Sequence, residues 1–440
     1  MKWLIAFLVF SLLVLFHEFG HFVVALLSGV EVEEFSLGFG PRLLSVKKGE
    51  TRYSIKLLLF GGSCRMKGMY AVPEEDEDGK ERAPEEGSFP AASLGKRAAI
   101  ILAGPVFNFI LAFICSVAVI SVIGYDPACI VYVGEDSSAA KAGLQTGDLV
   151  TNFNGDPVAI GRDISTWEML HDYSADKEIR IRYLRDGEEG EAVFYPDVTH
   201  RYMLGMTYTP GEESAEIQAV HSGSPLEEAG VRTGDVIKSI NGTEIHNAQE
   251  LNDYFAANPL DGTEITLVIG RGEKTYETKV SPAKRDDIRV GFAYNIGRTK
   301  TDPLGVLRYS FTEVRYWITT TVRALGGMFT GRFTVNDLSG PVGIVDIVGT
   351  TYEESKEDGP LMVFMNMLNL IILLSANLGV MNLLPIPALD GGRLLFLLIE
   401  GIRGKPVSQN AEIAIQSAAA LLLMALMVYV MYHDLVMMFT

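Results

Sequence analysis

Four long apolar segments dominate this chain of 440 residues, and each is long enough to cross a lipid bilayer as a helix. The first, residues 3–27, reads WLIAFLVFSLLVLFHEFGHFVVALL and would extend about 37 Å as a helix. The others lie at 98–123, about 361–384 and about 413–432. A signal peptide is the competing interpretation of the first segment, but that segment is too long and no small-residue cleavage site follows it. We therefore expect a multi-pass α-helical membrane protein with four transmembrane helices.

Composition excludes several other classes. The formal net charge of −18 argues against a basic surface for nucleic acid, so no nucleic-acid partner is expected. Hydrophobic residues make up 48% of the chain, which fits a protein whose main partner is the lipid bilayer. The three cysteines, Cys64, Cys115 and Cys129, are too few for a disulfide framework and have no CxxC spacing.

The basic residues indicate which loops face the cytoplasm. Four spans place both termini on one side, together with loop 30–97 and the loop at about 385–412. These loops carry Lys47, Lys48, Arg393 and Arg403, so the positive-inside rule places them in the cytoplasm. The long segment 125–360 is then expected outside, in a periplasm-like compartment.

An internal repeat occupies the outer segment. Ser137–Asp148 reads SSAAKAGLQTGD and is echoed by SPLEEAGVRTGD at Ser224–Asp235, with an Asn-Gly pair following each. The period of about 87 residues is too long for a solenoid repeat and indicates a duplicated domain. The pattern resembles PDZ domains, which bind peptides by adding a strand to a sheet edge. A purely structural module with an idle groove remains the alternative for either copy.

Two further segments have a recognisable periodicity. Apolar residues recur at helical spacing over 304–325, which predicts either an interfacial amphipathic helix or a helix packed on the second repeat. Residues 35–60 alternate apolar and polar side chains around a Lys-Lys-Gly-Glu turn at 47–50, which predicts one or two β-hairpins.

The first span contains a candidate metal site. His17 and His21 of the HEFGH sequence lie on one helix face and can share a zinc ion, with Glu18 placed to take a proton from metal-bound water. Each ionisable group in a bilayer costs about 2.5 kcal/mol or more, so three of them within five positions favour a bound ligand over a packing cluster.

The third zinc ligand is expected at comparable membrane depth. The first and third spans run in the same direction, and the far end of the third reads NLLPIPALDGGR. Asp390 is the only acid between Leu361 and Leu398. Pro385 and Pro387 break the helix there, which is tolerated only where the backbone is buried or lines a wet cavity. Asp390 is therefore the candidate third ligand; the alternative is an acid that faces water at a helix end.

HEFGH in a first span, NLLPIPALDGG in a later one and paired PDZ repeats between them resemble the site-2 protease family of intramembrane zinc metalloproteases. The tandem repeats are most similar to its regulator of sigma-E protease type, in the bacterial inner membrane. The resemblance implies that His17, His21 and Asp390 bind one Zn²⁺ and that Glu18 is the catalytic base. It also implies that Asn382 holds or polarises the substrate. The remaining implied substrate-site residues are Asn108 of the GPVFN sequence at 104–108, Pro385 and Pro387.

The same resemblance sets the expected domain order. It runs through helix 1 (1–29), a cytoplasmic loop with a membrane-associated β-hairpin element (30–97), helix 2 (98–124), PDZ domains (126–210 and 211–296), an amphipathic region (297–360), helix 3 with LDGG (361–393) and a final loop with helix 4 (394–440). An edge strand of the hairpin element could hold a substrate extended beside the zinc, because a helical peptide bond is shielded by its own hydrogen bonds. A plain cytoplasmic hairpin is the alternative.

The expected function is therefore cleavage of single-span membrane proteins within or near the bilayer. The family implies an anti-sigma factor that has already been cut once, and remnant signal peptides as further substrates. Peptide ligands of the PDZ domains are additional expected partners. The rival is a non-catalytic membrane scaffold or receptor that presents two PDZ modules, and a metal transporter is a weaker third option.

Overall fold

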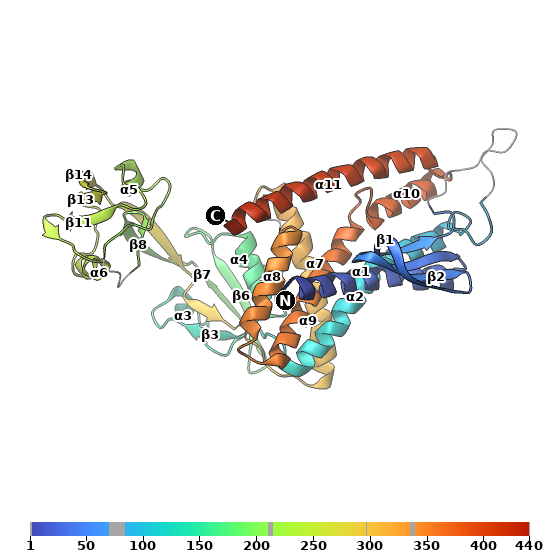
Figure 1. Cartoon of the computed structure of the whole chain (residues 1–440). Coiled ribbons are helices and arrows are strands. Elements are labelled where there is room, and N and C mark those ends of the chain that lie inside the picture. The colour runs from blue at the N-terminus through green and yellow to red at the C-terminus, as the bar shows by residue number, and fades with distance from the viewer. Residues whose placement is uncertain (1, 70–83, 210–213, 296, 335–338, 440) are drawn as a thin grey trace. The chain divides into compact units, whose positions relative to one another are not determined.

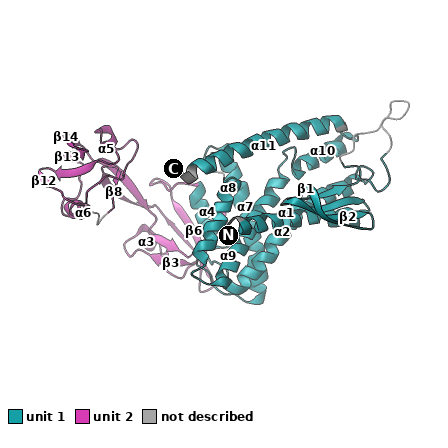
Figure 2. Ribbon diagram, viewed as in Figure 1, with its two compact units in different colours: residues 1–127, 159–170, 296–440 teal, residues 128–158, 171–295 magenta. Residues whose placement is uncertain are grey.

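The computed structural model describes residues 2–69, 84–209, 214–295, 297–334 and 339–439. The chain forms two compact units, each interrupted in sequence (Figure 2). The helical unit contains residues 1–127, 159–170 and 296–440, and the strand-rich unit contains residues 128–158 and 171–295. Each unit is described by itself.

The helical unit consists of long helices and one β-hairpin (Figure 1). Its elements are α1 (Lys2–Leu27), β1 (Val32–Lys48), β2 (Thr51–Met66), α2 (Leu94–Ile123), α4 (Gly161–Leu170), α7 (Pro303–Phe329), α8 (Pro341–Ser355), α9 (Pro360–Leu383), α10 (Asp390–Arg403) and α11 (Gln409–Phe439). Among the described residues, four helices are long and apolar enough to cross a membrane: Leu4–Leu27, Leu94–Ile123, Pro360–Leu383 and Asn410–Val436. They confirm the four spans expected from the sequence.

Helices α1 and α2 approach each other very closely. Gly20 of α1 makes this possible, because a Cβ atom at that position would stand 2.4 Å from the carbonyl oxygen of Ala103. Below this contact, Leu13 of α1, Ala112 of α2 and Ala376 of α9 belong to one buried apolar cluster. The helix that carries the two histidines is therefore fixed against α2 by direct backbone contact.

Strands β1 and β2 form the predicted hairpin with its turn at Gly49 and Glu50. Glu34 pairs with both Arg52 and Arg65, so the first half of β1 lies between two parts of the bent strand β2. The buried Glu34 carboxylate accepts hydrogen bonds from Arg42 and Ser54. The bond from Arg42 is the main reason why the pKa of Glu34 falls to about 2. The hairpin also exposes apolar side chains, namely Phe39, Leu43, Leu44, Val46, Leu57 and Leu58.

A tight chain reversal joins α9 to α10. Ala388 has a positive φ of 77°, in the left-handed region that non-glycine residues rarely adopt. A Cβ atom at Gly391 would stand 2.1 Å from the carbonyl oxygen of Leu384, and one at Gly392 would stand 2.4 Å from that of Ile386. The two glycines after Asp390 therefore let the first turn of α10 pack on the reversal.

Helix α7 covers the predicted amphipathic segment 304–325 and packs against α2 and α9. It also contributes Glu313 to a buried ion cluster. Arg162 of α4 contacts Asp126 at 2.9 Å and Glu313 at 2.5 Å. Burial alone would lower the pKa of the Arg162 guanidinium, but its bonds to the two carboxylates raise it above its usual value. Helix α4 is thus tied into the helical unit although neighbouring residues belong to the other unit.

The strand-rich unit contains the two repeats. The first provides β3 (Ile130–Val133), α3 (Ser138–Lys141), β4 (Leu149–Phe153), β5 (Asp156–Pro157), β6 (Ile179–Arg185) and β7 (Glu188–Phe194). The second provides β10 (Ala219–Val220), α5 (Pro225–Glu228), β11 (Val236–Ile240), β12 (Thr243–Glu244), α6 (Ala248–Ala257), β13 (Ile265–Arg271) and β14 (Lys274–Val280). The sheet orders β5-β4-β6-β7 and β12-β11-β13-β14 are equivalent, which confirms the duplicated PDZ-like fold.

Several short strands pair with strands that lie on the other side of the boundary between the repeats in the sequence. Strand β8 (Asp197–Met203) pairs with β15 (Ala283–Arg289), and β9 (Met206–Thr207) pairs with β10. Strand β16 (Phe292–Tyr294) follows the second repeat in sequence but pairs with β3 of the first. The pairings therefore cross the position between 210 and 211 where the sequence predicts one repeat to end and the next to begin.

Candidate metal centre

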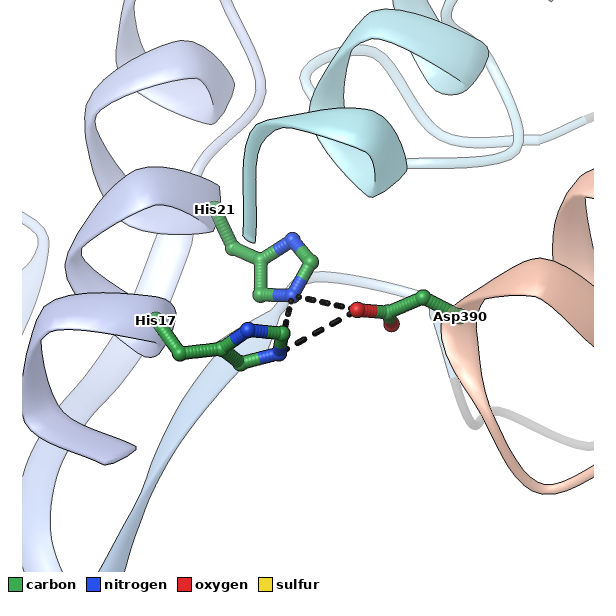
Figure 3. A group of neighbouring side chains, drawn as sticks. All are labelled: His17, His21 and Asp390. Atoms are coloured by element: carbon green, nitrogen blue, oxygen red, sulfur yellow. Dashed lines mark hydrogen bonds and ion pairs between the residues drawn. The ribbon is translucent and has the colours of Figure 1, made fainter. Parts of the chain in front are cut away.

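Three predicted ligands from two distant parts of the chain meet in the helical unit. His17 and His21 project from one face of α1, and Asp390 is the first residue of α10 (Figure 3). Oδ2 of Asp390 lies 3.1 Å from Nε2 of His17 and 3.3 Å from Nε2 of His21. The two Nε2 atoms are 3.3 Å apart. The three residues form a candidate metal site, the one found among the described residues.

The geometry of these atoms fits zinc. Ligand atoms about 2.0–2.1 Å from a tetrahedral zinc ion stand about 3.3–3.4 Å from one another. The observed separations of 3.1–3.3 Å are close to that value. Oδ2 of Asp390 is also buried with no hydrogen-bond partner in the described part of the chain. Three converging atoms with lone pairs repel one another unless a cation lies between them, and two histidines with one carboxylate form a common zinc ligand set.

Both imidazoles are oriented by groups on α2. Nδ1 of His21 lies 2.8 Å from the carbonyl oxygen of Ile100, which can only accept a hydrogen bond. Nδ1 of His21 therefore carries the proton, and its Nε2 keeps a lone pair for a metal. Nδ1 of His17 lies 3.1 Å from the side-chain amide of Asn108, which is fully buried. Asn108, predicted to contact substrate, thus lies behind His17, where it can hold the ring.

Glu18 lies beside the cluster and is held by the hairpin. Its Oε2 accepts a hydrogen bond of 2.8 Å from the backbone N–H of Cys64 in β2. A Cβ atom at Gly62 would stand 3.4 Å from Cγ of Glu18, so the strand passes directly against this side chain. Burial raises the pKa of the Cys64 thiol well above its usual range, with a smaller contribution from Glu18. The thiol therefore stays neutral, and Cys64 contributes its backbone donor to the site.

The remaining predicted residues lie around the reversal between α9 and α10. Asn382 is half-buried in the last turn of α9, Pro387 is half-buried and Pro385 is exposed. Their contact with substrate stays a prediction. Sequence reasoning missed the roles of Ile100, Cys64 and Gly104 near the histidines. Gly104 is the first residue of the GPVFN sequence, so that motif could have pointed to it. Ile100 and Cys64 act through backbone groups, which any residue type supplies, so the sequence could not have pointed to them.

A protein-family model and known relatives agree with this chemistry. A model of peptidase family M50 matches residues 5–426. A zinc metalloprotease RasP of Shouchella clausii is 31% identical over 457 aligned positions, which cover 100% of both chains. The regulator of sigma-W protease RasP of Bacillus subtilis is 30% identical, with 97% of this chain and 96% of that protein covered. Among solved structures, the PDZ domain of HtrA3 bound to a phage-derived ligand is 21% identical, covers 20% of this chain and 92% of its own, and has a TM-score of 0.17.

Proposed function

The chain belongs to peptidase family M50, as a multi-pass intramembrane zinc metalloprotease of the site-2 type, and from this premise we propose that His17, His21 and Asp390 hold its catalytic zinc. The observation that carries the proposal is the triangle of ligand atoms with sides of 3.1–3.3 Å, of which the two histidines lie on a helix able to cross the bilayer. The reaction is hydrolysis of a peptide bond within or near the membrane.

The chain's own residues have distinct roles in this reaction. A bound zinc ion would supply a Lewis acid and lower the pKa of water at the site. Glu18 takes the proton of the attacking water, and the N–H of Cys64 holds its carboxylate beside the ligands. Ile100 and Asn108 keep the two imidazoles in orientation. Asn382 polarises the substrate carbonyl, a role that rests on the family resemblance alone.

The hairpin offers a way to hold an extended substrate. Residues 62–66 of β2 pair with β1 on one side. No strand pairs with their other side in the described part of the chain, and that side carries the Cys64 N–H next to Glu18. A substrate that joined this edge would be unwound and would pass close to the metal ligands. This placement favours the edge-strand model over a plain cytoplasmic hairpin.

Substrate and orientation follow from analogy and charge. The B. subtilis relative is called a regulator of a sigma factor, which supports a single-span anti-sigma factor as substrate here. The substrate would first lose its outer domain to another protease, and remnant signal peptides are further candidates. The basic loops support a metal site toward the cytoplasmic side of a bacterial inner membrane, with the PDZ-like repeats outside, where they would meet peptide ligands.

One experiment tests the function. The purified protein is incubated in detergent or lipid nanodiscs with a single-span membrane substrate, before and after treatment with a chelator. We expect cleavage to stop after metal removal and to return with zinc but not with an equal concentration of magnesium. Cleavage that persists in metal-free protein would contradict a zinc mechanism. A non-catalytic scaffold or a metal transporter would cleave under neither condition.

A further inference from the structure

Helix α10 carries the third ligand, yet little of the helix packs on the element that precedes it. It contacts α2 more extensively than α9, although only a short reversal separates α9 from α10. The placement of Asp390 relative to His17 and His21 therefore depends on how α10 is fixed against α2.

An ion pair lies at the other end of this contact. Nη1 and Nη2 of Arg97, in the first turn of α2, donate to the two carboxylate oxygens of Glu400 at 3.0 and 2.5 Å. The side chains of Arg97 and Glu400 are only 14% and 18% exposed. Nε of Arg97 donates to the carbonyl of Ala92 at 3.1 Å, so the guanidinium is fixed before it meets its partner. A bidentate pair of this kind sets both distance and orientation.

The geometry links this pair to the ligands through two helices. Glu400 lies about three turns along α10 from Asp390, and Arg97 lies about two turns along α2 from Gly104. Gly104 packs against both imidazoles, since a Cβ atom there would meet His21 at 2.4 Å and His17 at 2.7 Å. Helices α2 and α10 therefore converge at the ligands and are clamped together at Arg97 and Glu400.

We propose that the Arg97–Glu400 pair positions Asp390 for zinc binding, by fixing α10 on α2. Arg97 and Glu400 touch neither metal nor substrate and act through α10, so they are positioning residues. The inference rests on the ligand set proposed above. Without the pair, α10 can turn or shift on α2, and the carboxylate then no longer completes the triangle with the two Nε2 atoms.

The test measures zinc affinity of the full-length protein by competition with a chromophoric chelator. We expect Arg97→Glu and Glu400→Arg each to weaken zinc binding by about tenfold or more, the lower end of what loss of a ligand-orienting partner costs. The double variant Arg97→Glu/Glu400→Arg restores the pair with reversed charges and should recover most of the loss. The matched control is Arg180→Glu, which breaks an exposed pair with Glu178 in the strand-rich unit and should leave the affinity unchanged.

The possible results distinguish a failure of the positioning role from a failure of the proposed zinc ligand set. If Asp390→Ala leaves zinc affinity at the wild-type value, the proposed ligand set is wrong. If Asp390→Ala weakens binding while both single variants bind like wild type, only the positioning role fails. A lower melting temperature of the chelator-treated single variants with unchanged zinc affinity would mark the pair as merely structural and overturn the inference. Failure of the reversed pair to recover affinity would overturn it as well.

Discussion

Gly104 of α2 lies so close to His21 that a Cβ atom at position 104 would stand 2.4 Å from Nε2 of the imidazole. The same atom would stand 2.7 Å from Cε1 of His17. Contacts this short force a shift of the rings or of the backbone behind them. The glycine therefore sets how closely α2 can approach the metal ligands.

Gly104→Ala should weaken zinc binding by about tenfold or more, because the added methyl group displaces both imidazoles from the positions in which they can share a zinc ion with Asp390. The measurement is zinc affinity in a chelator competition. Gly95→Ala is the matched control, since a Cβ atom at Gly95 of the same helix meets nothing within 4 Å. Equal zinc affinity in the two variants would show that the rings tolerate the methyl group.

Asn108 should act through the orientation of its amide. With Nδ2 3.1 Å from Nδ1 of His17, its Oδ1 is buried and has no hydrogen-bond partner in the described part of the chain. Turning the amide over lets Oδ1 accept the Nδ1–H, which frees Nε2 of His17 for the metal. We expect Asn108→Leu to weaken zinc binding by about 10–100-fold. Asn108→Asp keeps an acceptor and should stay within a few-fold of wild type, so equal losses in two folded variants would refute this role.

Glu18→Gln should abolish cleavage and leave zinc bound, because Glu18 is proposed as a base and not as a ligand. The amide is nearly isosteric and still accepts the Cys64 N–H, but it cannot take a proton from water. Turnover and zinc content are measured on the same preparation. Normal turnover of a membrane substrate by this variant would rule out the proposed mechanism.

Much of this site could be predicted because its chemistry lies in local patterns. His17 and His21 share a helix face through their spacing alone, and Asp390 stands out as an isolated acid beside an apolar span. The sequence also predicted the turn at 47–50 and the helix over 304–325. Those features depend on residues near one another in the chain.

Other features depend on contacts between residues that are distant in the chain, so they could not be predicted from local sequence patterns. The sequence assigned residues from about 385 to 412 to a loop, whereas Asp390 begins a separate helix, α10, in that stretch. One sequence pattern could have predicted the pairing of β9 with β10 and of β16 with β3. Leu204-Gly205-Met206 and Val290-Gly291-Phe292 repeat the same pattern, and each lies at the start of a strand that pairs in a repeat.

The stability of each repeat should depend on the aspartate that ends the repeated sequence, Asp148 in the first repeat and Asp235 in the second. Arg271 donates two hydrogen bonds to the buried Asp235 carboxylate, and Arg185 donates to Asp148 in the same way. The bonds from Arg271 are the main reason why the pKa of Asp235 falls to about 2, although burial opposes the shift. Because this pKa is lower in the folded state, the stabilisation is complete above the unfolded value of about 4 and disappears as pH falls toward 2.

Asp235→Asn should therefore lower the free energy of local unfolding of the second repeat by about 2 kcal/mol at pH 7, as expected for hydrogen bonds to a charged group. Hydrogen exchange of the amides in β13 and β14 measures this change. Glu264→Gln is the control, because its pair with Lys279 is exposed and should matter much less. A difference between Asp235→Asn and wild type that persists undiminished at pH 2 would contradict the assigned role of the carboxylate.

The repeats are expected on the outer side of the membrane, where the outer domain of a substrate would also lie, so we predict that they act as a gate against bulky substrates. Deletion of 126–295 would remove Asp126 and Arg162 and leave Glu313 of α7 buried without these partners. A cleaner variant removes residues 204–282, which hold the complete apolar core of the second repeat. Met203 pairs with Ala283, so a two-residue Asn-Gly linker can join β8 to β15 as a hairpin and leave β16 on β3.

This variant should bind zinc as tightly as wild type, because the ligands and their supports lie in the helical unit. If the second repeat excludes bulky outer domains, the variant should cleave a full-length substrate that wild type cleaves only after trimming. Cleavage of full-length and pre-trimmed forms of one substrate is compared for both enzymes, and zinc content is measured in parallel. An unchanged preference for the trimmed form would refute the gate. Loss of all cleavage with zinc still bound would instead show that the second repeat is needed to position the substrate at the site.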